Sequence, residues 1–380
     1  MRRCPPRAGG GPGGPAEESD AMADFLVHRD DPRTFRFDDG EAAASDVAEG
    51  AVQFTVERFG LTANNLTYAV LGDALHYWDF FPAPEGWGRI PAWGFGRAEA
   101  SGVEGIAVGD RFYGYWPMST RVTLQVTAGG PGFVDSSPAR AALPAVYNRY
   151  LRAVPATGFP AALDDAAAVV RPLFLTGWLI ADQLAGSAWH GAGTVVLASA
   201  SSKTALCTAA AIRERDDPPS VIGLTSAGHV ASTAALGLYD EVLPYDEVAA
   251  LPRDRGVVLV DMAGDPGIRA AVHETTREAL RASIMVGATH WERASLEGAD
   301  LPGPQPEMFF APTVAQERAA DLGELPFARR LGAAWAEFAT ARLPQLVRFE
   351  HATGADALAG AYTALLEGAV DPRRGLVLSL

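Results

Sequence analysis

Residues 194–214 read TVVLASASSKTALCTAAAIRE: a short apolar run, a turn of small and hydroxyl residues, and an apolar helical stretch. Strand-like and helical segments continue to alternate as far as residue 289. They are SVIGLTS (220–226), ASTAALG (231–237), DEVLPY (240–245), GVVLVDMAG (256–264), a helix through Glu278, and SIMVGAT (283–289). Because apolar strands that alternate with helices form parallel sheets covered by helices, this half predicts a doubly wound parallel sheet in an α/β fold.

The residues before this stretch follow a different pattern. From Phe25 to about Gln125, short β-favouring runs are separated by Gly, Pro and Asn, which predicts a compact antiparallel barrel. The runs are AVQFTVERFGL (51–61), GRIPAWGFGRAEASG (88–102) and DRFYGYWPMSTRVTLQV (110–126). A helical stretch at 162–186 carries Asp164 and Asp165 where a helix N-terminus favours negative charge, and we expect it to bridge the two parts.

These patterns predict two domains and two terminal segments. Residues 1–21, rich in Gly, Pro and Arg, are expected to be a disordered tail, and a start codon assigned upstream of Met22 would explain them equally well. The barrel is expected over 22–160, and the parallel sheet with its bridging helix over 161–340, ending in a long helix around 328–341. Residues 341–380 contain a helix and strands that are expected to return to the barrel domain.

Composition excludes several classes of partner. The chain has 46 acidic and 31 basic residues, a net charge of −15 that repels nucleic acid and anionic membrane surfaces. The longest apolar segment, 173–181, is far shorter than the roughly 20 residues that a bilayer requires. The only cysteines, Cys4 and Cys207, cannot form a disulfide framework or a cysteine-built zinc site, and they favour a cytoplasmic protein.

Three segments carry a resemblance to a known superfamily. They are RIPAWGFGRAEASGVEGIAVGDRFYGYWP (89–117) with its Gly109-Asp110 turn, LTGWLIADQL (175–184), and VRFEHATGADALAGAYTALLEGAVDPRRGLVLSL (347–380). Over residues 25–380 the chain resembles the medium-chain dehydrogenase/reductase superfamily, on its zinc-free quinone-oxidoreductase side, in a branch filed as a domain of unknown function. The resemblance implies an N-terminal GroES-like barrel for substrate, a Rossmann domain for a dinucleotide, and Thr176 facing the nicotinamide.

Zinc-dependent members of that superfamily use a cysteine and histidines as ligands. The barrel part of this chain has no cysteine, and its two histidines, His28 and His76, have no partners at ligand spacing. We therefore predict no metal site.

The turn after the first parallel strand replaces the usual glycine-rich loop with Ser199, Ala200, Ser201, Ser202, Lys203 and Thr204. Small side chains permit close approach of a pyrophosphate, the hydroxyls can donate to it, and the lysine supplies a positive charge. The alternative is that the serines only cap the following helix and Lys203 stays solvated.

The second strand of the sheet ends at Thr225 and Ser226, followed by His229, with no acidic residue before Asp240. NAD-binding domains use a carboxylate here for the ribose 2′-hydroxyl, so its absence favours NADPH, whose 2′-phosphate these three side chains can bind. The alternative is that Thr225 and Ser226 cap the next helix.

Reduction of a carbonyl without a metal needs a hydrogen-bond donor at the oxygen. Tyr77 falls near the position at which related enoyl reductases carry a catalytic tyrosine, so the resemblance implies this role for Tyr77, with Tyr68 as its nearest competitor. The segment that contains Asn64 and Asn65 is similar to the asparagine-containing turn that lines the cleft in zinc-free members, which implies that Asn65 lies there. His290 follows the strand-like segment SIMVGAT (283–289) at its carboxyl end, and Gly287 lies in that segment; both are expected near the nicotinamide. The alternatives are that Tyr77 only packs among aromatic residues, that the asparagines only form a turn, and that His290 is structural.

Two functions remain open from the sequence. The first is a zinc-independent NADPH-dependent oxidoreductase that reduces a small apolar carbonyl, enone or quinone, for which a homodimer would be ordinary. The second is a catalytically inactive dehydrogenase-like fold that serves as a binding or interaction protein.

Overall fold

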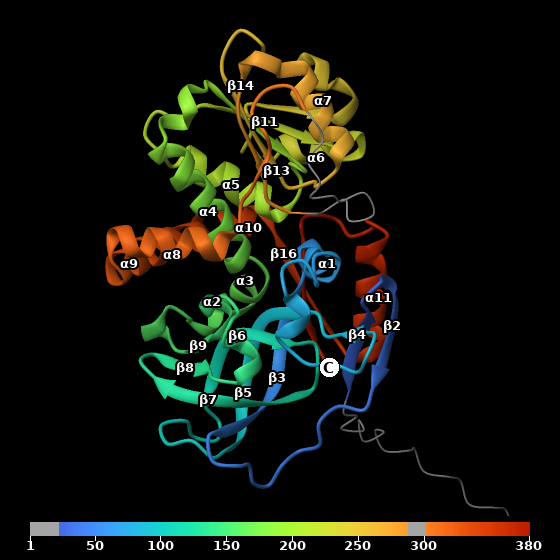
Figure 1. Ribbon diagram of the computed structural model, residues 1–380, viewed down its shortest axis with the longest axis vertical. Helices are drawn as coiled ribbons and strands as arrows, with labels where there is room; N and C mark the ends of the chain where they lie inside the picture. Colours follow the sequence, from blue (N-terminus) through green and yellow to red (C-terminus); the bar gives the residue numbers. More distant parts are fainter. Residues whose placement is uncertain (1–22, 288–300) are drawn as a thin grey trace, which may run out of the picture.

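The computed structural model describes residues 23–287 and 301–380. The predicted tail and His290 lie outside these ranges. The molecule has two units stacked along its long axis, a barrel below and a helix-covered sheet above. Helices α3 (Asp164–Val169) and α4 (Arg171–Gly186) run between them (Figure 1). The α/β fold class predicted from the sequence, an antiparallel barrel followed by a doubly wound parallel sheet, is confirmed.

Six strands form the barrel, in the order β3-β5-β6-β9-β8-β7, and the pairing of β3 with β7 closes it. Their bounds are β3 (Ala51–Leu61), β5 (Pro91–Ser101), β6 (Arg111–Pro117), β7 (Arg121–Gly129), β8 (Gly132–Asp135) and β9 (Arg149–Arg152). Alternate residues of β7 are buried, as expected for a strand with one face toward a core. Aromatic rings fill the interior, with Phe54 and Phe133 stacked at 5.2 Å between ring centroids.

Smaller elements cover the barrel. A three-stranded sheet consists of β2 (Asp31–Asp38), β1 (Asp24–His28) and β4 (Trp87–Gly88), and the short helices α1 (Ala63–Val70) and α2 (Ala145–Asn148) lie on the side that faces the other unit.

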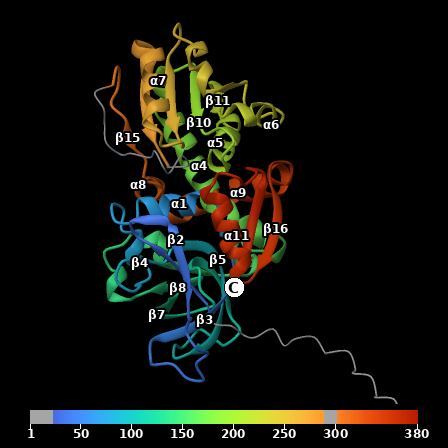
Figure 2. The same ribbon diagram turned by 90° about the vertical axis from the view of Figure 1, so that its right-hand side faces the viewer.

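Residues 348–380 lie beside the barrel (Figure 2). Strand β16 (Arg348–Thr353) pairs in parallel with β17 (Arg374–Ser379), which pairs antiparallel with β3. Helix α11 (Ala355–Leu366) contributes Leu358 and Tyr362 to the barrel core, and the Tyr362 hydroxyl donates to the Pro32 carbonyl at 2.9 Å. The predicted domain boundaries at residues 160 and 340 stay a prediction.

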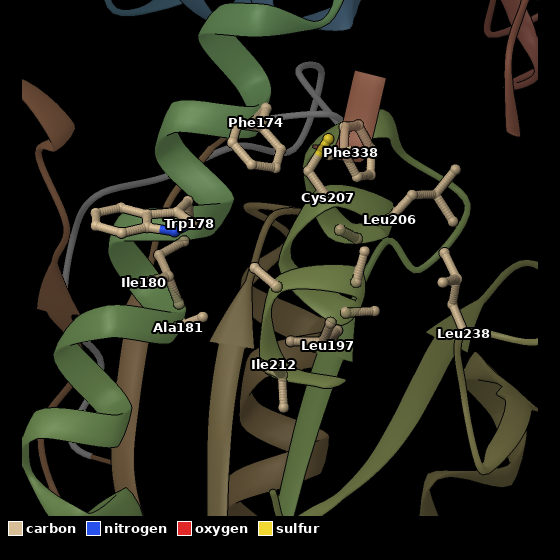
Figure 3. Close-up of a cluster of buried hydrophobic side chains, with 14 of the residues drawn as sticks. Phe174, Trp178, Ile180, Ala181, Leu197, Leu206, Cys207, Ile212, Leu238 and Phe338 are labelled. Carbon is tan, nitrogen blue, oxygen red and sulfur yellow. The ribbon is translucent and has the colours of Figure 1, made fainter. Parts of the chain in front are cut away.

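The second sheet is parallel, in the order β12-β11-β10-β13-β14-β15. Its strands are β10 (Thr194–Ala198), β11 (Ser220–Thr225), β12 (Glu241–Pro244), β13 (Val257–Asp261), β14 (Leu280–Met285) and β15 (Glu307–Met308). All residues of β10 and β13 are buried, because helices cover both faces of the sheet. Helices α4 (Arg171–Gly186) and α5 (Lys203–Arg213) cover one face, and α7 (Pro266–Thr276) packs on the other. Helix α6 (Val230–Ala234) lies in the connection from β11 to β12. Figure 3 shows the core between α4, α5 and β10, with Phe174, Cys207 and Leu197 among its side chains.

The bridging helix differs from the expectation of one continuous helix over 162–186. It is divided at Val170 into α3 (Asp164–Val169) and α4, because Pro172 has no N–H to continue the hydrogen-bonding pattern. The two helices remain joined end to end between the units.

The long helix expected around 328–341 is the second half of a helical hairpin. Helix α8 (Ala311–Leu322) turns at Gly323, with φ +86°, into α9 (Glu324–Glu337), a π-helical segment (Phe338–Arg342) and α10 (Leu343–Leu346). The buried carboxylate of Asp182 holds this hairpin to α4 and α5, because it pairs with Arg215, Arg318 and Arg330.

A candidate dinucleotide site between the barrel and the parallel sheet

A cavity of about 380 Å³ lies where the barrel meets the carboxyl ends of the parallel strands. Ligands of doubly wound sheets bind at this edge, where the order of the strands reverses, which here is between β10 and β13. The parallel-sheet side of the wall consists of Ser199, Ser201, Ser202, Lys203, Thr204, Thr225, Ser226, His229, Tyr245, Met262, Val286 and Gly287. Thr176 of α4 also lines the cavity, and its hydroxyl donates to the Pro172 carbonyl at 3.1 Å.

The turn between β10 and α5 opens toward the cavity. Ser199 has φ +58°, the left-handed conformation that glycine adopts most easily, so a serine takes the backbone geometry of the missing glycine. Ser202 is the N-cap of α5, and its hydroxyl oxygen accepts from the Ala205 N–H at 3.3 Å. The capping interpretation therefore holds for Ser202, while Ser199 and Ser201 also line the cavity.

Ala200 does not line the cavity. It is fully buried, its N–H donates to the Leu224 carbonyl at 2.9 Å, and its carbonyl accepts from the Tyr239 hydroxyl at 2.7 Å. Ala200 thus fixes the turn to β11.

Lys203 does not stay solvated, so that part of the alternative interpretation is wrong. Its ammonium group donates to the Pro372 carbonyl at 2.9 Å, in the segment between α11 and β17. Burial lowers the pKa of Lys203 to about 8, against the opposing effect of nearby Asp371. Lys203 therefore links the turn between β10 and α5 to the C-terminal segment on the barrel.

The end of β11 gathers the three residues expected near the ribose. The Thr225 hydroxyl donates to the Ser201 hydroxyl oxygen at 3.2 Å, and the Ser226 hydroxyl lies 3.0 Å from His229 Nδ1. Ser226 precedes a short 3₁₀ segment but forms no side-chain cap there, which contradicts the capping alternative for this residue.

The barrel side of the cavity is aromatic, with Tyr68, Tyr77, Trp93 and Tyr147 in its wall. Ring centroids of Tyr68 and Tyr77 lie 4.4 Å apart, and the hydroxyls of Tyr77 and Tyr147 lie 3.5 Å apart. Burial raises the pKa of each of these tyrosines, so all three hydroxyls hold their protons at neutral pH. They are hydrogen-bond donors in a largely apolar wall.

Asn64 and Asn65 belong to helix α1 and not to a turn. Asn65 is buried outside the cavity wall: its Oδ1 accepts from the Thr62 N–H at 2.8 Å and its Nδ2 donates to the Pro91 carbonyl at 3.0 Å. The Oδ1 atom thus completes the capping box of α1, and the Nδ2 atom ties the helix start to β5. Asn64 lines the cavity instead, and its Nδ2 donates to the Tyr68 hydroxyl at 2.6 Å.

Sequence reasoning missed several residues of the wall. Tyr245 follows β12 at its carboxyl end, so the rule that selected His290 could have found it. The C-terminal segment contributes Gly368, Val370 and Pro372 to the wall. No local sequence pattern connects these residues with the turn between β10 and α5.

Residues 23–287 and 301–380 contain neither a metal-binding cluster nor a helix that could span a membrane. No cluster of His, Cys, Asp and Glu side chains is placed to hold a metal ion there. No helix in these ranges combines the length and apolar character needed to cross a bilayer.

The model of the family described as "Protein of unknown function (DUF2855)" matches residues 59–371 of this chain. The sequence matches no curated protein at a significant level.

Solved structures share the fold at low identity. CurA from Vibrio vulnificus, in complex with NADPH, has a TM-score of 0.62 and 14% identity, over 94% of this chain and 98% of that chain. The yhdH oxidoreductase from Salmonella enterica, in complex with NADP, has a TM-score of 0.55 and 15% identity, over 94% of this chain and 100% of that chain. CurK enoyl reductase has a TM-score of 0.52 and 12% identity, over 95% of this chain and 99% of that chain. At such identities the likeness establishes the shared fold.

Proposed function

The chain belongs to the DUF2855 family, and from this premise we propose that it is a zinc-independent, NADPH-dependent oxidoreductase that reduces a small apolar carbonyl, enone or quinone. The observation that carries the proposal is one cavity with hydroxyl groups and a lysine on its sheet side and tyrosine hydroxyls on its barrel side. Two structures of the same fold support it: CurA is in complex with NADPH, and yhdH is described as an oxidoreductase in complex with NADP.

The turn at the start of α5 fits a pyrophosphate. The left-handed backbone of Ser199 and the small side chains beside it leave room for close approach. The first N–H groups of a helix have no intrahelical partners, so those of α5 are suited to phosphate oxygens, and the hydroxyls of Ser199 and Ser201 add donors. Lys203 supplies the positive charge, and its contact with Pro372 keeps it at the cavity.

The end of β11 fits a ribose that carries a 2′-phosphate. Thr225, Ser226 and His229 line the cavity there and offer hydrogen-bond donors, and the described residues of the wall include no carboxylate. A carboxylate would repel the phosphate and favour NADH. We therefore propose that NADPH is the preferred cofactor.

The chemistry at the barrel side follows from the aromatic wall. Bound NADPH supplies a hydride to the substrate. Thr176 and Gly287 lie on the sheet side of the cavity and would hold the nicotinamide in place, whereas His290 lies outside the described residues. Tyr77 or Tyr68 donates a hydrogen bond to the carbonyl oxygen on which negative charge builds, and the apolar rings exclude water.

Consumption of NADPH by the purified full chain tests this proposal, with a panel of uncharged quinones and aryl enones as substrates. We expect turnover with NADPH and at least about ten-fold lower kcat/KM with NADH. Saturable NADPH binding without turnover of any carbonyl compound would support the alternative, an inactive fold that serves as a binding protein.

A further inference from the structure

The two tyrosines proposed as donors have different surroundings. Tyr68 lies one turn after Asn64 on α1, so the two side chains share a face of the helix. The Asn64 Nδ2 group donates to the Tyr68 hydroxyl oxygen at 2.6 Å. Because an amide N–H can only donate, this contact occupies the tyrosine oxygen as an acceptor and leaves the hydroxyl hydrogen for another acceptor.

Negative charge on the Tyr68 oxygen is better stabilised than burial alone would suggest. Burial raises the pKa of Tyr68, but interactions with Trp93, Tyr115 and Asn64 oppose the rise. The Tyr115 ring lies at 5.6 Å from the Tyr68 ring. Of these neighbours, Asn64 points a donor N–H directly at the oxygen that would carry the charge after proton transfer.

Tyr77 lacks such support. Its hydroxyl lies 3.5 Å from that of Tyr147, at the limit of a hydrogen bond. Burial and the neighbouring Tyr68 both raise the pKa of Tyr77, and only the contact with Tyr147 opposes them. Loss of a proton from Tyr77 would leave a poorly stabilised phenolate in an apolar wall.

We propose that Tyr68 is the proton donor of the reaction and that Asn64 is its positioning residue. This inference rests on the proposed function. The carbonyl carbon, or the β-carbon of an enone, receives the hydride, and the displaced electron pair moves onto the carbonyl oxygen. The Tyr68 O–H bond then breaks, its proton joins that oxygen, and the phenolate is neutralised by a proton from water.

The test compares three Tyr→Phe variants of the full chain with the wild type. Circular dichroism first confirms that each variant folds. With a quinone or enone that the wild type reduces, Tyr68→Phe is expected to lose about 10²-fold in kcat, with NADPH affinity unchanged. Tyr77→Phe is expected to lose less than about ten-fold, mainly in KM. Tyr113→Phe is the matched control: its ring stacks on Trp93 but its hydroxyl donates to the Ala167 carbonyl, outside the cavity wall.

Asn64→Asp separates positioning from packing. The introduced carboxylate accepts the Tyr68 hydrogen instead of donating, so kcat should fall at neutral pH and recover in acid as the carboxyl gains a proton that it can donate. Asn64→Leu should be slow at every pH.

The outcomes distinguish this inference from the proposed function. If Tyr68→Phe keeps wild-type kcat while Tyr77→Phe is crippled, Tyr77 is the donor and the inference is overturned. If kcat of Asn64→Asp depends on pH in the same way as kcat of the wild type, the proposed positioning role of Asn64 is contradicted. If the wild type neither binds NADPH nor reduces any compound of the panel, the proposed function fails, and the inference fails with it.

Discussion

Lys203 is the first residue of α5 and reaches across the cavity to the segment that precedes β17. Its partner is the carbonyl of Pro372, which carries no charge, and we propose that the ammonium group supplies positive charge to a phosphate. The burial that lowers its pKa to about 8 makes this charge sensitive to mildly alkaline pH.

We predict that NADPH affinity falls as the pH rises through about 8, because the free protein then loses the ammonium charge that the phosphate requires. Below that pH the lysine is charged, and its contribution to binding is complete. Lys203→Ala should weaken binding by about 1–3 kcal/mol at neutral pH and abolish this pH dependence. Fluorescence titrations from about pH 6.5 to about pH 9.5 measure both effects.

Lys203→Arg is the matched control, because a guanidinium stays charged throughout this range. Its affinity should be independent of pH. A wild-type affinity that is constant across about pH 8, or an alanine variant that binds NADPH as tightly as the wild type, would contradict the role of Lys203.

The candidate site could be predicted from the sequence wherever it follows the strands of the sheet. Ser199 to Thr204 and Thr225 to His229 directly follow β10 and β11, and strand ends of a parallel sheet meet at one edge. The place of Asn65 in the cleft was harder to predict, because a polar residue near the start of a helix can either contact a ligand or cap the helix. The structure shows that Asn65 caps α1. The contact of Lys203 with Pro372 joins residues 169 positions apart, which no local pattern reveals.

At the scale of elements, the cover of the sheet depends on the close approach of α4 and α5. Gly177 of α4 faces the backbone of α5: a Cβ atom there would lie 2.6 Å from the Thr208 nitrogen and 2.9 Å from the Cys207 carbonyl carbon. Figure 3 shows the two helices beside each other over β10. Since α4 also carries Thr176, and α5 begins at Lys203, their spacing sets the width of the sheet side of the cavity.

Gly177→Ala is therefore predicted to lower the free energy of unfolding by about 1–3 kcal/mol, because α4 must move away from α5. Denaturant unfolding followed by circular dichroism measures the change. Gly186→Ala in the same helix is the control: nothing lies within 4 Å of a Cβ atom there, so stability should be unchanged or slightly higher. Equal stability of the Gly177 variant and the wild type would show that the contact is not tight.

The sequence predicted elements best where their own residues are periodic. The segment AVQFTVERFGL coincides with β3, and TVVLASA contains β10. Helix α8 was missed because it has no buried residue and hence no apolar stripe to detect. The break between α3 and α4 was also missed, although Pro172 marks it, because apolar residues continue on both sides.

At the scale of the molecule, the cavity needs both units and the C-terminal segment. The sheet supplies the turn between β10 and α5, and the barrel supplies the tyrosines. Pro372 of the C-terminal segment lines the wall beside Lys203. The proposed chemistry uses hydrogen-bond donors alone at the carbonyl oxygen, so a Lewis acid is not required.

We accordingly predict that the purified protein carries no stoichiometric zinc. Prolonged treatment with a chelator should leave its melting temperature and its NADPH-dependent activity unchanged, because we predict no ligand set from the sequence. Elemental analysis before and after treatment is the measurement. One tightly bound zinc per chain, or loss of activity that added zinc restores, would refute the zinc-independent mechanism.

The central claim is that the cavity between barrel and sheet is a dinucleotide site, and titration of the full chain with NADPH tests it most directly. Nicotinamide fluorescence should change saturably with one site per chain, and NADH should bind more weakly, since Thr225, Ser226 and His229 have no 2′-phosphate to contact. If neither nucleotide gives a saturable change at about 1 mM, the claim is contradicted and the fold serves another purpose.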